Sequence, residues 1–285
     1  MSRLISIGVT ILLVCALSAV AQQITVAGYN ARHVELDEGA LAWEARRGVV
    51  LKILSEAAPD LLLLQEAAEE QREDLLAGLE WLRCAGCDVE FDNHNAIFYR
   101  PELLKLLQAG SFWLSDTPDV AYSESWGNEV PRFVTWARFE TMDSGRQLVV
   151  YNTHLDHAHQ GSRVRSLEAI VVHAAENAAE LPIILGGDLN AEPDWPELEY
   201  LLAPVEGSPH LPLTDPLAEL SADEEVGGTY HAFDAEPEFA RIDYILLSEE
   251  FDPVAARIIT RIGDDGTPPS DHFPILVSIE LPTSR

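Results

Sequence analysis

Short apolar runs recur along the chain, and most of them end in polar residues. Runs of about four to eight apolar or alternating residues bounded by turn residues are typical of β-strands, whereas apolar residues at helical spacing indicate helices. Strands are predicted over residues 24–29, 61–64, 96–99, 110–114, 133–139, 147–151, 181–185, 241–247 and 274–281. Helices are predicted over residues 40–57, 69–79 and 162–179.

The order of these segments indicates the fold class. Strands and helices alternate in the first part of the chain, and a hairpin with a turn at 143–145 follows. This order predicts an α/β sandwich, in which two packed mixed β-sheets are flanked by helices. Residues 203–238 are rich in Pro, Gly and acidic residues, so we expect long surface loops with one short helix, of the kind that often sets substrate choice.

Polar groups able to bind metal or move protons lie at the ends of several predicted strands. They are Asn30, Glu66, His154, Asp188 with Asn190, and Asp271 with His272. In the segment 186–190, two glycines are expected to let the backbone turn tightly. Asp188 and Asn190 then lie on the same side of the chain, where they are suited to holding and activating a water molecule.

Each of these residues also has a purely structural interpretation. Turn formation or capping accounts for Asn30, Glu66, Asp188 and Asp271, and a surface position accounts for His154 and His157. Asp243 is harder to explain in this way, because it interrupts an apolar strand, where a carboxylate is costly unless it is paired. Its natural partner is a histidine whose ring it orients.

The chain is strongly acidic, with a formal net charge of −30. Such a surface repels nucleic acids and anionic membranes at long range. Lys52 and Lys105 are the two lysines, so arginine supplies the remaining positive charge. Any arginine beside the strand-end groups is therefore of interest as a phosphate ligand, although pairing with the many carboxylates is the alternative.

Residues 1–21 are predicted to be a secretory signal peptide. Arg3 precedes a mostly apolar stretch, and residues 19–21 form a small-x-small cleavage site before Gln22. The alternative, a transmembrane anchor, is disfavoured because the stretch is short and no basic residues follow it. We therefore expect residues 22–285 to be exported to the periplasm or the cell exterior, without stable membrane insertion. Their length suits one large domain or two, and we expect a monomer.

Cys84 and Cys87 lie three positions apart in the exported part of the chain. This spacing in such a protein favours a local disulfide. A zinc site would need a second ligand pair at matching spacing, which the sequence lacks, and no thioredoxin-like setting for a redox motif is visible.

Taken in order, the polar motifs resemble those of the endonuclease/exonuclease/phosphatase superfamily. The matching segments are 28–30, 64–66, 152–157, 187–190, 241–245 and 270–274. Small secreted bacterial members are most similar, because they share the segment 126–136 and the arginine found here as Arg163, although His159 stands where many of them have glycine. The resemblance implies a four-layer α/β sandwich and Mg²⁺-dependent hydrolysis of phosphate esters, with Mn²⁺ able to substitute.

The resemblance also implies a metal site and a water-activating group. Glu66 is expected to be the main Mg²⁺ carboxylate, with Asn30 beside it and Asp271 completing the site, since Mg²⁺ prefers hard oxygen ligands. Asp188 is expected to orient or deprotonate the attacking water, and Asn190 to hold water or phosphate.

The remaining groups are expected to contact the phosphate. His272, aligned by Asp243, stabilises its charge, and His154 donates to a phosphoryl oxygen or assists the leaving group from the other side. Further phosphate or substrate contacts are expected from Arg132, Arg163, Arg241, His157 and His231.

These features predict a secreted phosphoesterase that acts on a small or sugar-like phosphorylated compound, as a monoesterase or a diesterase. The alternative is a secreted nuclease that cleaves DNA or RNA, which the acidic charge and the lack of a basic track disfavour. A non-catalytic binding module would have lost site residues, and all the expected ones are present. Residues 112–114 are apolar and fit either a membrane-contact loop or a core strand.

Overall fold

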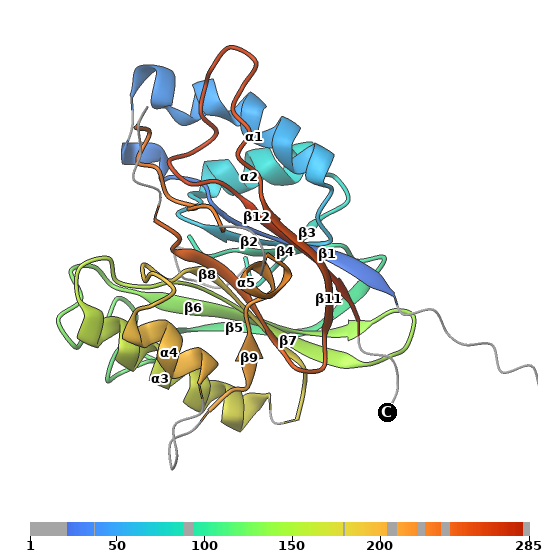
Figure 1. Ribbon diagram of the computed structural model, residues 1–285, viewed down its shortest axis with the longest axis vertical. Helices are drawn as coiled ribbons and strands as arrows, with labels where there is room; N and C mark the ends of the chain where they lie inside the picture. The colour runs from blue at the N-terminus through green and yellow to red at the C-terminus, as the bar shows by residue number, and fades with distance from the viewer. Residues whose placement is uncertain are drawn as a thin grey trace, which may run out of the picture.

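The computed structural model describes residues 22–36, 38–87, 94–178, 180–203, 210–221, 226–234 and 240–281. Two mixed sheets of six strands each pack face to face, and helices cover their outer faces, so the predicted four-layer α/β sandwich is confirmed (Figure 1). The predicted signal peptide, residues 1–21, lies outside the described residues. Among the helices that the structure describes, none has both the length and the apolar character needed to cross a membrane.

The first sheet has the strand order β11-β12-β1-β2-β4-β3. Its strands are β1 (Gln23–Asn30), β2 (Leu61–Gln65), β3 (Arg83–Ala85), β4 (Ile97–Tyr99), β11 (Asp252–Ile258) and β12 (Ile275–Glu280). β1 and β2 are parallel and are joined through α1 (Trp43–Ala57), whereas the other neighbours are antiparallel. α1 and α2 (Glu69–Gly78) cover the outer face of this sheet (Figure 1).

The second sheet has the order β5-β6-β7-β8-β10-β9. Its strands are β5 (Leu104–Trp113), β6 (Phe133–Thr141), β7 (Gln147–His154), β8 (Ile183–Asp188), β9 (Leu213–Thr214) and β10 (Asp243–Ser248). β7 and β8 are its one parallel pair and are joined through α3 (Gln160–Asn177). α3 and α4 (Pro196–Leu202) cover the outer face, and the short α5 (Pro216–Leu220) lies near β10 and β11.

The alternation of side chains along each strand produces the layers. Leu61 and Leu63 of β2 belong to the core between the two sheets, whereas Leu62 and Leu64 belong to the core under α1 and α2. A third core lies between the second sheet and the helices α3 and α4. Since both faces of the central strands are buried, their sequences are almost continuously apolar, which explains why these strands were predictable.

The central strands also position the polar groups. Successive side chains point to opposite faces of a strand, so residues two apart share a face. Ile24 and Val26 face the second sheet, and Asn30 continues this face at the end of β1. In the second sheet, Ile184 and Asp188 have the same relationship along β8. The apolar core between the sheets thus ends in polar side chains at one edge.

The expected turn at Gly186 and Gly187 is wrong, because β8 continues through both residues to Asp188. A Cβ on Gly186 would lie 2.4 Å from a methyl group of Leu63 in the facing sheet, and one on Gly187 would lie 1.9 Å from the Thr153 carbonyl oxygen. Gly187 also has φ +139°, which favours glycine. The two glycines therefore permit close packing within and between the sheets.

β10 begins at Asp243, so this carboxylate lies at a strand end and does not interrupt the strand as predicted. Most other differences concern short or exposed elements. β3, β9, β11 and α4 were not predicted, and β5 is longer than the predicted strand. β11 lies at a sheet edge with most of its side chains at least partly exposed, so it lacks the apolar pattern of a buried strand. Residues 112–114 are buried at the end of β5 and belong to the core. Cys84 and Cys87 are joined by the expected disulfide.

Candidate active site

The ends of the two parallel strand pairs meet at one edge of the sandwich. The Asn30 Nδ2 atom donates to the Glu66 carboxylate at 3.2 Å and to the Asp188 carboxylate at 3.1 Å, which joins the two sheets. His154 Nε2 lies 3.4 Å from Asp188 Oδ2, and its Nδ1 lies 3.9 Å from Glu66 Oε1. Four of the predicted residues, from four strand ends, are therefore in contact with one another.

Glu66 reaches this cluster through an unusual backbone conformation. It follows β2 with φ +55°, in the left-handed region that a residue other than glycine seldom adopts. Its Oε2 accepts a 2.9 Å hydrogen bond from the backbone N–H of His33, and its side chain is 21% exposed. The strained turn aims a partly accessible carboxylate toward the other strand ends, and such strain is common at functional sites.

Asp188 is the central acid of the cluster. It is 2% exposed, and its Oδ1 accepts a 3.0 Å hydrogen bond from the backbone N–H of Asn190, whose φ is +48°. Burial, with the charge of Asp243 as a second cause, raises the pKa of Asp188 to about 7. A carboxylate with this pKa can accept a proton near neutral pH, as a general base must.

His272 and Asp243 form a buried pair beside Asp188. The His272 Nδ1 atom donates to Asp243 Oδ2 at 2.9 Å, and its Nε2 lies 3.7 Å from Asp188 Oδ2. Burial disfavours the charged imidazole, but the charge and hydrogen bond of Asp243 outweigh burial and raise the pKa of His272 to about 10. His272 is thus a cation at neutral pH.

His154 has the opposite protonation state. Burial, followed by the positive charges of Arg132 and His272, holds the pKa of His154 well below its ordinary value. Asp188 therefore has one neutral and one charged histidine beside it, His154 and His272.

These groups line a cavity of about 400 Å³, which we call the site cavity. Its lining residues are Arg32, Glu66, Arg132, His154, His157, Asp188, Asn190, Tyr230, Ile242, Asp271 and His272. Two arginines and a charged histidine offer contacts to an anion in this cavity, beside the three carboxylates that also line it.

The donor set also fits a hard divalent cation. Mg²⁺ usually binds one or two carboxylates and keeps several waters, and the accessible Glu66 carboxylate faces the site cavity. The Asn30 oxygen accepts from the Arg32 backbone N–H at 3.0 Å, so its nitrogen faces the carboxylates. Asp271 accepts from Arg32 Nη1 at 3.1 Å and from the Ser270 hydroxyl at 3.2 Å. Glu66 is 21% exposed, whereas Asp271 is 5% exposed and paired with Arg32, so Glu66 is the better placed of the two to hold a metal.

Asp188, Asp243 and His272 form a buried cluster whose potential ligand atoms lie within 4.8 Å of one another. In this cluster His272 Nδ1 donates to Asp243 at 2.9 Å, and its Nε2 lies 3.7 Å from Asp188 Oδ2. We therefore interpret this cluster as a hydrogen-bonded acid–base group.

Arg163 and Arg241, expected to bind phosphate, pair instead with carboxylates elsewhere in the fold. Arg163 Nε donates to the buried Glu197 carboxylate at 2.6 Å, and Arg241 pairs with Asp215 at the start of α5. Neither arginine lines the site cavity. Both arginines thus pair with carboxylates, which was the alternative to phosphate binding. We therefore interpret them as residues that stabilise the fold.

His157 and His231, the other two histidines predicted to contact substrate, occupy different surroundings. His157 lines the site cavity, where its Nε2 lies 3.1 Å from Glu129 and its Nδ1 lies 3.4 Å from Arg132 Nη2. His231 is buried against Phe273, with ring centroids 4.4 Å apart, and does not line the site cavity. His231 thus packs against the segment that carries His272, outside the site cavity.

Arg32 and Tyr230 line the site cavity but were not predicted. Arg32 lies two positions after Asn30. In a chain with few basic residues, this short separation from a predicted site residue could have indicated that Arg32 belongs to the site. Tyr230 has its ring centroid 4.9 Å from that of His272, a contact between distant segments that no local pattern contains.

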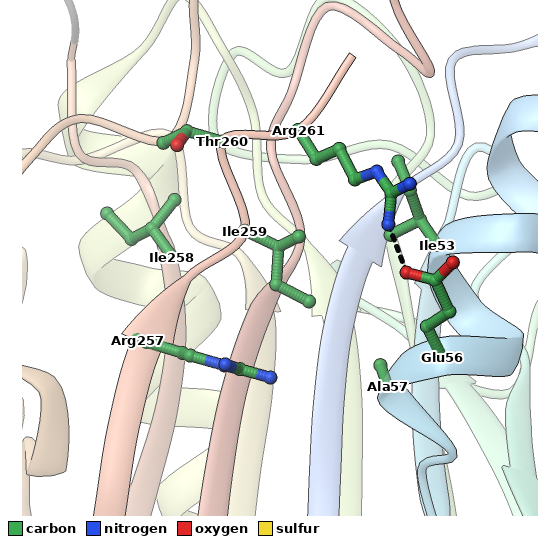
Figure 2. Close-up of a pocket in the computed structure, with 8 residues that line it drawn as sticks. All are labelled: Ile53, Glu56, Ala57, Arg257, Ile258, Ile259, Thr260 and Arg261. Atoms are coloured by element: carbon green, nitrogen blue, oxygen red, sulfur yellow. Dashed lines mark hydrogen bonds and ion pairs between the residues drawn. The ribbon is translucent and has the colours of Figure 1, made fainter. Parts of the chain in front are cut away.

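A second cavity, of about 440 Å³, lies between the C-terminal part of α1 and the segment 257–261 (Figure 2). Ile53 and Ala57 form part of its lining, and Arg261 pairs with Glu56 across it. None of the predicted catalytic or metal-binding residues lines this cavity, so we do not assign the reaction to it.

Comparison with known proteins identifies the family. The model of the endonuclease/exonuclease/phosphatase family matches residues 27–272, and the chain belongs to this family, whose members are phosphoester hydrolases and nucleases. An endonuclease/exonuclease/phosphatase from Bacteroides vulgatus is 25% identical with a TM-score of 0.81, and the match covers 91% of this chain and 99% of that one.

Two further relatives have names that describe more particular proteins. A mannosyl-6-phosphatase from Bacteroides thetaiotaomicron is 28% identical with a TM-score of 0.75, over 90% of this chain and 99% of that one. Nocturnin from Drosophila melanogaster is 24% identical over 90% of this chain, but the match spans 45% of its own length. The chain thus spans about half of that relative.

Proposed function

We propose that this protein is an exported Mg²⁺-dependent phosphoesterase that hydrolyses a small or sugar-like phosphorylated compound. The observation that carries the proposal is that Asn30, Glu66, His154 and Asp188 contact one another at one edge of the sandwich. Arg32 and Arg132 line the site cavity beside them. Similarity to a mannosyl-6-phosphatase supports the choice of a small phosphorylated substrate.

The side chains have distinct roles in the proposed reaction. Asp188, which accepts a hydrogen bond from the backbone N–H of Asn190, accepts a proton from the attacking water. The His272 cation and Arg132 bind phosphoryl oxygens, and neutral His154 donates a hydrogen bond toward the phosphate or the leaving oxygen. Glu66, held by Asn30, is the residue that would bind Mg²⁺.

Mg²⁺, when bound, would neutralise charge that develops on the phosphoryl group. Phosphoryl transfer needs such electrostatic stabilisation and positioning more than covalent chemistry.

The test compares wild-type protein with Glu66→Ala and Asp188→Ala. Each is assayed with Mg²⁺ and with EDTA on sugar phosphates, bis-p-nitrophenyl phosphate, plasmid DNA and RNA. We expect Mg²⁺-dependent release of phosphate from small substrates and its loss in both variants, while Mg²⁺ affinity measured by calorimetry falls mainly in Glu66→Ala. Full activity in either purified variant would refute the site. Rapid DNA or RNA cleavage without small-molecule turnover would establish the nuclease alternative instead.

A further inference from the structure

A smaller cavity of about 190 Å³ adjoins the site cavity, and we call it the side pocket. Glu66, Arg132 and His154 line both cavities, so the two share one wall. The other lining residues of the side pocket come from the segment just before β4 and from the segment that leads into β6. They are His94, Asn95, Val130, Pro131 and Phe133.

The direction of the reaction determines what the side pocket receives. In phosphoryl transfer, the attacking and leaving oxygens lie roughly in line on opposite sides of phosphorus. Asp188 and Asn190, which hold the attacking water in our proposed function, line the site cavity but not the side pocket. Arg132 and His154 line both cavities, where they would contact the phosphoryl group. The leaving group is therefore directed toward the side pocket.

The walls of the side pocket differ in chemistry. Val130, Pro131 and Phe133 supply apolar surface, whereas His94 and Asn95 supply polar side chains. The Asn95 amide donates to the Phe133 backbone carbonyl at 3.0 Å, and Phe133 packs against Trp113 with ring centroids 5.3 Å apart. The hydrogen bond joins the two walls and the ring contact holds Phe133 in place, and such preorganisation favours selective binding.

The size of the side pocket limits its occupant. A volume of about 190 Å³ corresponds to roughly six water molecules at ~30 Å³ each, the scale of a single ring. A sugar ring presents apolar C–H faces and a rim of hydroxyl groups, which match the two kinds of wall. Extended nucleic acid would instead require a basic groove with stacking platforms, and among the described residues Arg132 is the one arginine or lysine that lines the side pocket.

We propose that the side pocket binds the alcohol portion of a phosphomonoester, a single polyhydroxylated ring, and thereby selects the substrate. This inference rests on the proposed function, because it assumes phosphate hydrolysis at Asp188 and His154. A monoester fits because only one ester substituent has to be accommodated, while the remaining phosphoryl oxygens face the cations of the site cavity.

The test fills the side pocket from its exposed rim. Val130 is 40% exposed, so Val130→Trp adds bulk with little risk to folding, and Val120→Trp is a matched control in the same β5–β6 connection, at a 55% exposed position that does not line the pocket. Steady-state kinetics are measured with mannose 6-phosphate, glucose 6-phosphate and methyl phosphate, and inhibition by inorganic phosphate reports binding at the site cavity.

We expect Val130→Trp to lower kcat/KM for both sugar phosphates at least tenfold, with little change for methyl phosphate and less than a twofold change in the inhibition constant of phosphate. His94→Ala should alter the ratio of mannose 6-phosphate to glucose 6-phosphate turnover, and Val120→Trp should change none of these values. If Val130→Trp affected all substrates equally, or had no effect, the proposed role of the side pocket would be wrong while the proposed function remained intact. Absence of phosphate-ester hydrolysis by the wild-type protein would overturn both.

Discussion

The His272 imidazole donates a 2.9 Å hydrogen bond from Nδ1 to the Asp243 carboxylate, and both side chains are buried. Burial acts against the charged ring, but Asp243 overcomes it, and the pKa of His272 rises to about 10. The pair thus provides a cation next to Asp188 throughout the neutral range.

We expect Asp243→Asn to lower the pKa of His272 well below about 10, because only the smaller effects of Asp188 and Asp271 then oppose burial. NMR titration of the imidazole nitrogens in the metal-free protein measures this pKa directly. The wild-type ring should remain protonated to about pH 10. An unchanged titration in Asp243→Asn would show that other groups hold the proton.

The same pair predicts how stability depends on pH. Since the folded pKa of His272 is raised above its unfolded value, its stabilisation is fully present below about pH 6.5 and is lost as the pH approaches about 10. Urea unfolding between about pH 8 and about pH 10 should therefore show a decline in the wild-type protein that is smaller in Asp243→Asn. Parallel declines in the two proteins would contradict the raised pKa.

Arg132 and Arg163 test the difference between a site arginine and a structural one. Arg163→Gln leaves Glu197 fully buried without its charged partner, which should cost about 3–5 kcal/mol of unfolding free energy. Arg132→Gln should change stability little but lower kcat/KM at least tenfold, since Arg132 lines the site cavity.

The control for this comparison is Lys105→Gln, which removes an exposed pair with Glu140 and should cost less than about 1 kcal/mol. Chemical unfolding and steady-state kinetics measure the two effects separately. A stable Arg163→Gln protein with impaired phosphate binding would restore Arg163 to the site.

Burial on both faces explains how much of the fold was predictable. β1, β2 and β8 are apolar because each lies between a second sheet and a helix layer, and the polar residues that end them are visible against that background. The resemblance to a known family then supplied the four-layer arrangement. Edge strand β11 was not predicted, because its side chains are largely exposed and it therefore lacks the apolar pattern of a buried strand.

Contacts between distant segments explain what was missed at the site. The partners of the two structural arginines, Glu197 and Asp215, lie 34 and 26 positions away from them, so local sequence could not separate pairing from phosphate binding. The side pocket likewise combines the segment before β4 with the segment that leads into β6. The pattern of apolar residues locates strand ends, whereas these pairings depend on how the ends of different strands meet.

Gly187 has a predictable role in stability. Gly187→Ala would place a Cβ 1.9 Å from the Thr153 carbonyl oxygen at a residue with φ +139°, so β7 and β8 would have to separate. We expect a loss of about 2 kcal/mol or more in unfolding free energy. Gly161→Ala is the control, because the added Cβ meets nothing within 4 Å in α3 and should be neutral or stabilising. Equal stability of the two variants would rule out the proposed close packing at Gly187.

Arg46 connects the fold to the site from outside the site cavity. Its fully buried guanidinium donates to the carbonyl of Pro269 at 2.6 Å and to those of Ala31 and Arg32 at 3.1 and 3.2 Å. It thereby fastens the segment after β1 to the segment before β12, the two segments that carry Arg32 and Asp271. Arg46 is in this sense a positioning residue.

Arg46→Met should lower the unfolding free energy by about 3 kcal/mol or more, because several buried carbonyls lose a charged donor. At temperatures where the variant remains folded, kcat/KM should still be reduced, since the Arg32–Asp271 pair is no longer held in place. Arg46→Lys keeps the charge but lacks the planar fork that reaches several carbonyls, so we expect it to recover only part of both losses. If folded Arg46→Met retained wild-type kcat and KM, Arg46 would stabilise the fold without positioning the site.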